Sequence, residues 1–308
     1  MKIFKLNSIL FLFYSNFILN ISSNSQTINT NKINESPTEI YGNHKNEIKI
    51  KISNGGAGPT GIIKALAEDY LSQNIDKKFA IAWYQNISLN SLNLLKGKKV
   101  DIALVYEPID AHKSVKEGLT SHYTLIFYDH FLIVGPKKNK ANINRSDSPS
   151  AAFAKIAKYG EQQNSKKLFL SRNDFSGTNI KERLIWTLIQ KAPFEEDNSH
   201  WYFKYSTFPM EALLKADKEE MYTITDWGTW LNAAKKMKNT EIFIRGGDDL
   251  LNPCVALLQN NPSKEALDFL SYLKSDRAQK IIANHGKEKF ESQSFFTSAH
   301  QPEFENKL

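Results

Sequence analysis

The octapeptide Ser171 to Thr178, SRNDFSGT, combines residue types that bind anions. The apolar run 168–170 before it predicts a buried strand. A helix from Asn179 to about Ala192 is predicted after it. The apolar face expected for that helix consists of Ile180, Leu184, Ile185 and Leu188.

The last three residues of the octapeptide, Ser176, Gly177 and Thr178, would open this helix. Free backbone N–H groups and the positive end of the helix dipole make such a position an anion receptor. Gly177 would let a ligand approach the backbone closely. Arg172 adds a planar fork of donors that suits a tetrahedral oxyanion. The simpler interpretation is that Ser176 or Thr178 is an N-cap and Arg172 a surface charge.

A second strand, loop and helix unit lies near the start of the chain. Alternation over 48–52 predicts a strand, and helical spacing begins at Ile62. The loop between them contains glycines at 56, 58 and 61, the spacing of a dinucleotide fingerprint. The next strand, 79–85, does not end in the acidic residue that such a site needs. We therefore favour a loop that surrounds an anion with amides and small side chains.

Composition limits the classes of function. The chain has 308 residues, 41% hydrophobic and 12% aromatic, enough for two globular domains. Its net charge of +7 comes without a dense Lys/Arg block, so we expect no nucleic-acid partner. Cys254 is the only cysteine, which excludes an intramolecular disulfide. The seven histidines are dispersed, so we expect neither a metal site nor a cofactor.

The N-terminus has the outline of a secretory signal. Residues 1–5 are basic, an interrupted apolar stretch follows, and small polar residues come next. We therefore expect a signal peptide over 1–25 and export to the periplasm or the extracellular space. Residues 26–46 are rich in Asn, Ser, Thr and Lys, which predicts a disordered leader.

Strands that alternate with helices predict α/β lobes with largely parallel sheets. We expect lobe I to comprise 47–136 plus 244–308, and lobe II 137–243, with a ligand between the lobes. The run 125–134 is expected to form a strand, a bend and a second strand. Asp226 follows a predicted strand, and we favour an N-cap role for it.

These motifs resemble the substrate-binding component of tungstate-type ABC importers, a periplasmic-binding-protein fold of the second class. The octapeptide is the most specific of them, and together they span 48–286. The other segments that carry the resemblance are 60–63, 101–108, 128–136, 201–202, 222–229 and 252–253.

The resemblance implies an exported, two-lobed protein that closes on an oxyanion, tungstate or molybdate, and presents it to an ABC permease. We expect a monomer without enzymatic activity. Arg172 and Thr178 would be the lobe II contacts. The candidate ligand-binding residues are Ser53, Asn54, Gly55, Gly56, Tyr106, Arg172, Ser176, Gly177, Thr178 and Asp226.

The first loop departs from the family, because glycines replace most of its hydroxyl residues. Backbone amides and the Asn54 amide are expected to substitute for them. Asp174 bears on which anion is bound. A carboxylate facing the ligand would favour a protonated ion such as hydrogen phosphate, whereas one that holds Arg172 allows tungstate. Two alternatives therefore stay open: a phosphate-binding protein of the same fold, and a secreted interaction protein that has kept the fold without transport.

Overall fold

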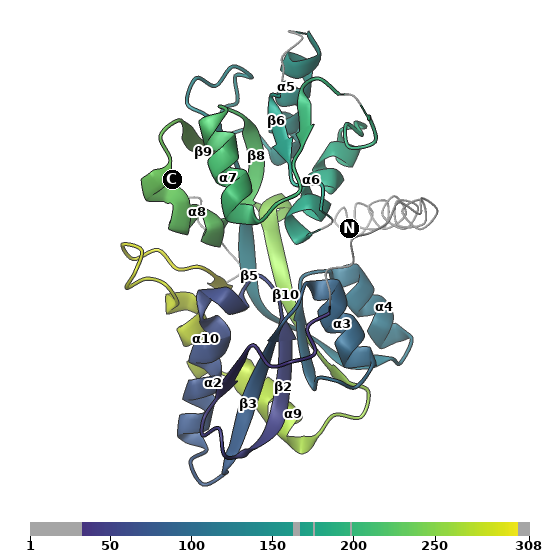
Figure 1. Cartoon of the computed structure of the whole chain (residues 1–308), viewed down its shortest axis with the longest axis vertical. Coiled ribbons are helices and arrows are strands. Elements are labelled where there is room, and N and C mark those ends of the chain that lie inside the picture. Colours follow the sequence, from purple (N-terminus) through teal and green to yellow (C-terminus); the bar gives the residue numbers. More distant parts are fainter. Residues whose placement is uncertain (1–32, 163–166, 175, 198, 301–308) are drawn as a thin grey trace, which may run out of the picture. The chain divides into compact units, whose positions relative to one another are not determined.

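The computed structural model describes residues 33–162, 167–174, 176–197 and 199–300 (Figure 1). Residues 1–33 and 34–308 form separate units, and the fold described here is that of the second. The predicted signal peptide lies outside the described residues. Within the described ranges, none of the helices has the length and apolar character that a membrane span requires.

The elements alternate between strands and helices along most of the chain, as the sequence predicts. The strands are β1 (Glu39–Tyr41), β2 (Glu47–Asn54), β3 (Phe79–Gln85), β4 (Ile102–Val105), β5 (Thr120–Pro136), β6 (Phe169–Ser171), β7 (Tyr202–Lys204), β8 (Tyr222–Asp226), β9 (Thr240–Arg245), β10 (Leu251–Gln259) and β11 (Thr297–Ser298). The helices are α2 (Ile62–Gln73), α3 (Ser88–Lys96), α4 (Pro108–Lys116), α5 (Pro149–Gln162), α6 (Gly177–Leu188), α7 (Pro209–Lys218), α8 (Trp227–Ala233), α9 (Lys264–Leu273) and α10 (Asp276–Asn284), with short 3-10 turns η1 (Gly58–Thr60), η2 (Ala234–Lys236) and η3 (Asp248–Leu250).

The strands follow one path in the order β1-β3-β2-β4-β10-β5-β8-β6-β7, with β9 and β11 paired to β5. At one end β2 is parallel to both β3 and β4, and at the other β6 is parallel to both β7 and β8. Each parallel group therefore directs the carboxyl ends of its strands, and the loops that follow them, to one edge.

Strand β5 connects the two parallel groups. Its first part pairs with β10, from Thr120 to His130 (Figure 1). From Phe131 onward it pairs with β8 and β9. The run 125–134 is thus one continuous strand, and the predicted bend is wrong. Among the strands described, residues 131–136 pair with β8 and β9, and the lobe boundary expected at 136 stays a prediction.

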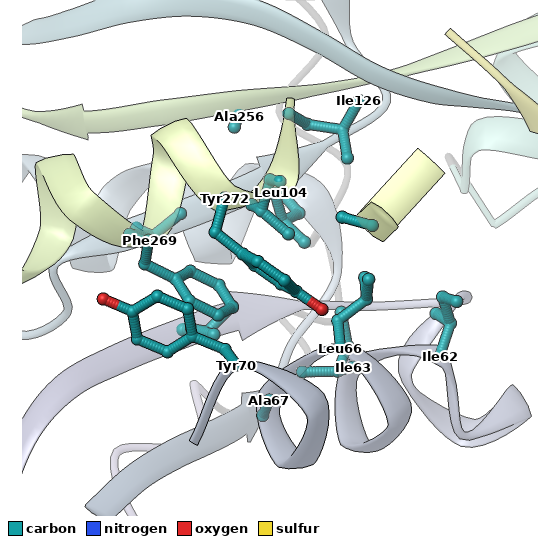
Figure 2. Close-up of a cluster of buried hydrophobic side chains, with 14 of the residues drawn as sticks. Ile62, Ile63, Leu66, Ala67, Tyr70, Leu104, Ile126, Ala256, Phe269 and Tyr272 are labelled. Carbon is teal, nitrogen blue, oxygen red and sulfur yellow. The ribbon is translucent and has the colours of Figure 1, made fainter. Parts of the chain in front are cut away.

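The main core of lobe I lies between α2, α9 and the sheet. Ile63, Leu66 and Tyr70 recur at helical spacing on α2 and are buried. Figure 2 shows this face of α2 directed toward Phe269 and Tyr272 of α9. The rings of Tyr70 and Phe269 meet edge to face with centroids 5.0 Å apart. This packing fixes α2, and with it the glycine loop that leads into the helix.

The expectation of a disordered leader over 26–46 is wrong for its described part. β1 pairs with β3 in antiparallel register, Glu39 opposite Trp83. Asn34 N–H also donates to Asn86 Oδ1 at 2.8 Å. The polar composition predicted disorder, but this segment contains a short edge strand. Such a strand is held by backbone pairing, which needs few apolar side chains.

Candidate functional site

The octapeptide lies between the buried strand β6 and helix α6, as predicted. Ser176 is the N-cap residue, but its hydroxyl does not cap the helix. It donates instead to Asp174 Oδ1 at 2.7 Å. The Ser176 hydroxyl therefore does not occupy the start of α6, where backbone N–H groups together with the helix dipole can receive an anion.

Arg172 is held beside this helix end by two acceptors. Its Nη2 donates to Asp174 Oδ2, and its Nε donates to the carbonyl oxygen of Thr207 at 3.0 Å. The Arg172 side chain is 12% exposed. The remaining guanidinium donors are presented in a fixed orientation, which favours binding of an oxyanion.

Asp174 connects the two parts of this receptor. Besides Arg172, it accepts from the Ser176 hydroxyl and from the Ser176 N–H at 3.1 Å. Its carboxylate thus positions Arg172, and the structural role favoured for it is confirmed. Asp174 therefore gives no reason to expect a protonated ligand.

A buried carboxylate on α6 anchors the octapeptide from behind. Glu182 is 1% exposed and accepts four hydrogen bonds. The donors are Ser171 Oγ (2.6 Å), Asn179 Nδ2 (3.0 Å), Trp186 Nε1 (3.0 Å) and Tyr202 Oη (2.5 Å). Burial raises the pKa of Glu182 above its ordinary value, and the four donors oppose that shift. The network ties β6, α6 and β7 together, which fixes the geometry of the loop.

This network corrects the predicted orientation of α6. The buried side chains of the helix are Thr178, Asn179, Glu182, Arg183, Ile185 and Trp186. Leu188, expected on the apolar face, is 44% exposed. The polar residues turn inward because Glu182 and its donors satisfy one another there. Apolar spacing alone therefore predicts the buried face only in part, since Ile185 is buried as expected and Leu188 is not.

The loop after β2 contributes less than the sequence predicts. Ser53 is fully buried, and its hydroxyl bonds Ser91 Oγ at 2.9 Å and the Tyr84 carbonyl at 3.2 Å. Asn54 is fully buried too. Its amide donates to the Leu104 carbonyl and accepts from Gly58 N–H, both at 2.9 Å. Both side chains are engaged within the fold, so their predicted role as ligand donors is wrong.

The glycines of this loop serve different purposes. A Cβ on Gly55 would lie 2.8 Å from the carbonyl oxygen of Asn86, so that glycine permits a close backbone approach. A Cβ on Gly56 would meet nothing within 4 Å, and the same holds for Gly177 in the octapeptide. Gly56 and Gly177 therefore leave their backbone open to a ligand, and they remain candidate contacts together with Thr178, which is 8% exposed.

Tyr106 follows β4, beside the loop that follows β2. Its Oη is buried without a hydrogen-bond partner among the described residues. Burial raises the pKa of its hydroxyl well above the ordinary value, so the group is a neutral donor. Tyr106 thus remains a candidate for binding an acceptor.

Asp226 is the N-cap of α8, the role favoured for it. Its Oδ1 accepts from Thr229 N–H at 2.7 Å and its Oδ2 from the Thr229 hydroxyl at 2.6 Å. Both oxygens are thus engaged with Thr229, and a direct contact between Asp226 and the ligand stays a prediction.

The structure gathers the predicted residues into two groups. Arg172, Ser176, Gly177 and Thr178 form one receptor on lobe II. Tyr106 lies near Asp226, within electrostatic reach. Across the described residues, no hydrogen bond or ion pair joins the 53–61 loop to the octapeptide.

Two contributors were missed: Glu182 and Thr207. Glu182 lies four residues from both Thr178 and Trp186. A carboxylate at that place in a helix next to the octapeptide is a signal of its role. Thr207 contributes a backbone carbonyl, which leaves no trace in the sequence.

Within the described ranges, no group of three His, Cys, Asp or Glu side chains is arranged to hold a metal ion.

Comparison with known proteins agrees with this architecture. A protein of Haloferax volcanii, provisionally described as an ABC transporter anion-binding protein, is 30% identical over 220 residues, which cover 68% of this chain. This chain spans only 60% of the length of that relative. The tungstate-binding protein TupA of Peptoclostridium acidaminophilum is 27% identical over 216 residues, 68% of this chain and 72% of TupA.

A solved structure, provisionally titled a periplasmic metal binding protein, superposes with a TM-score of 0.77 at 32% identity, covering 85% of this chain and 98% of its own. The family model described as PBP superfamily domain matches residues 31–277. The two-lobed α/β prediction of the second class is thereby confirmed, and the chain belongs to the PBP superfamily.

Proposed function

We propose that this protein is an exported solute-binding protein that captures a tetrahedral oxyanion, tungstate or molybdate, and delivers it to an ABC permease. The observation that carries the proposal is the receptor on lobe II. It combines the start of α6, which the hydroxyl of the N-cap residue Ser176 does not cap, with the oriented guanidinium of Arg172. Both groups supply donors, and a fully deprotonated oxyanion supplies only acceptors.

Relatives support the class of ligand. One is described as anion-binding and another as tungstate-binding. The engagement of Asp174 with Arg172 and Ser176 also agrees with an ion that carries no proton. We further propose that the protein acts as a monomer without enzymatic activity, in the periplasm or outside the cell.

The test is the substitution Arg172→Ala, measured by titration calorimetry of the full chain with sodium tungstate. Losing a charge-assisted hydrogen bond of about 1.5–3 kcal/mol should raise Kd by about tenfold or more. Arg145→Ala is the matched control, because Arg145 lies in the same lobe in an exposed pair with Glu241. That control should leave Kd unchanged.

Equal tungstate affinity in the Arg172→Ala variant and the unmodified protein would remove the central contact from the proposal. If neither protein bound tungstate or molybdate, the interaction-protein alternative would take its place.

A further inference from the structure

Tyr106 belongs to a cluster of polar groups whose bonding is incomplete. Its buried Oη makes no hydrogen bond of ordinary geometry among the described residues, and the Cys254 thiol, a weak hydrogen-bonding group, lies within its reach. Asp129 and Asp226 are further electrostatic neighbours of Tyr106. Leaving a buried hydroxyl unsatisfied costs about 1–3 kcal/mol. A ligand oxygen that accepts a hydrogen bond from the Tyr106 hydroxyl would remove that cost.

The cluster lies where β5 passes from one lobe to the other. Asp129 is opposite Asn252 of β10. Two residues later, Phe131 is already opposite Asp226 of β8. Tyr106 follows β4, the other neighbour of β10 in the sheet. Groups from both lobes therefore meet at this point.

The two carboxyl groups of the cluster differ in their hydrogen bonds. Asp226 accepts two from Thr229, at 2.7 and 2.6 Å. The hydrogen bond recorded for Asp129 is from the N–H of the next residue, His130, at 2.7 Å. Burial, and then the charge of Asp226, raise the pKa of Asp129 well above its ordinary value. Two like charges close together in a buried site favour a proton on the less well bonded carboxyl group.

None of the other titratable groups described around Asp129 is shown to pair with its carboxylate charge. Burial raises the pKa of Tyr106, from the β4 end, and of Cys254 on β10, so both are uncharged. His130 is uncharged as well, since burial and then Arg245 of β9 lower its pKa to about 4. Arg245 stacks over the Trp227 ring, with its guanidinium carbon 3.6 Å from the ring centroid.

Building on the function proposed above, we propose that Tyr106 and a protonated Asp129 both donate hydrogen bonds to oxygens of the bound oxyanion, so that the ligand is held together with one proton. The two donors replace the hydroxyls that the glycine loop lacks. A carboxylic acid can donate only while it is protonated, so the affinity depends on pH.

The direction of this dependence follows from linkage. Below the pKa of Asp129 in the free protein, the proton is already present and Kd is constant. Above that pKa, each binding event must take up a proton, so Kd rises tenfold per pH unit. Molybdate is fully deprotonated in neutral and alkaline solution, so any proton taken up is held by the protein.

The experiment is calorimetric titration of the full chain with sodium molybdate from about pH 7 to about pH 9. Pairs of buffers that differ in ionisation enthalpy give the number of protons exchanged. For the unmodified protein we expect uptake that rises toward one proton with increasing pH, with a matching rise in Kd.

Three variants locate the proton. Asp129→Asn keeps a donor but cannot titrate, so its Kd should be independent of pH and its proton uptake should vanish. Tyr106→Phe should raise Kd by about tenfold at every pH while the uptake remains. The control is Glu107→Gln, which removes another carboxyl group whose pKa is raised by burial, to about 7. The control should retain both the affinity and the proton uptake.

Binding without proton exchange at any pH, or the same uptake in Asp129→Asn, would overturn the inference and leave the proposed function intact. Loss of the uptake in Glu107→Gln would assign the proton to Glu107 and overturn it as well. If the unmodified protein bound neither molybdate nor tungstate, both proposals would fall.

Discussion

Gly58 and Gly177 show how identical residues can serve the fold in one place and the ligand in another. A Cβ on Gly58 would lie 1.9 Å from a ring carbon of Trp83, inside the lobe I core. A Cβ on Gly177 would meet nothing within 4 Å. Gly58 is thus required by packing, whereas Gly177 leaves space in front of the α6 amides.

The two alanine substitutions should therefore have opposite effects. Gly58→Ala overpacks the core and should lower the free energy of unfolding by about 1–3 kcal/mol or more. Gly177→Ala should leave stability equal or raised by up to about 1 kcal/mol, while it weakens tungstate binding several-fold. Denaturant unfolding and calorimetry measure both quantities. If Gly177→Ala bound tungstate as tightly as the unmodified protein, the α6 amides would not face the ligand.

At the residue scale, the sequence predicted the roles of Asp174 and Asp226 well, because their partners lie within three residues. It failed for Ser53 and Asn54, whose side chains donate to partners far along the chain. Ser91 and Leu104 are 38 and 50 residues away, respectively. Local pattern shows which groups can donate, but not which partners the fold brings to them.

At the scale of elements, Glu182 determines how α6 is oriented and how the octapeptide is supported. Replacing it by alanine would leave the Ser171, Trp186 and Tyr202 donors without their acceptor. The free energy of unfolding should then fall by about 3 kcal/mol or more. Denaturant titration measures this loss.

Stability should also depend on pH through Glu182. Since its pKa is raised in the folded protein, its contribution is fully present below the ordinary Glu value of 4.5 and is lost as pH rises through the folded pKa. Glu182→Gln removes that titration. The stability of the unmodified protein relative to Glu182→Gln should therefore decrease from acidic to neutral pH. An increase would mean that the four donors outweigh burial and lower the pKa.

Strong periodicity predicted most elements, and weak periodicity accounts for those that were missed. Helix α4 contains two lysines, a histidine and an aspartate in nine residues, with only Ala111 and Ser114 buried. The prediction divided strand β5 at the polar residues Asp129 and His130, because no local pattern indicates that such residues belong inside a strand with buried ends. Both are accommodated there because Asp129 receives a backbone hydrogen bond and His130 bonds Thr297.

At the scale of the whole molecule, the alternation of strands and helices was enough to predict two α/β lobes. The residue at which the chain passes from one lobe to the other was not predictable, because β5 is continuous where it changes partner strands. Tyr106, Asp129 and Asp226 come from both sides of that point in β5, so their proximity depends on tertiary structure alone.

We expect the molecule to bind a deprotonated tetrahedral oxyanion. The most direct test is a thermal-shift titration of the full chain with tungstate, molybdate, phosphate and sulfate at equal ionic strength. A ligand that binds only the folded state raises Tm in proportion to the logarithm of its concentration. We predict such a rise with tungstate and molybdate and none with phosphate. A rise with phosphate alone, or with none of the four anions, would contradict the account.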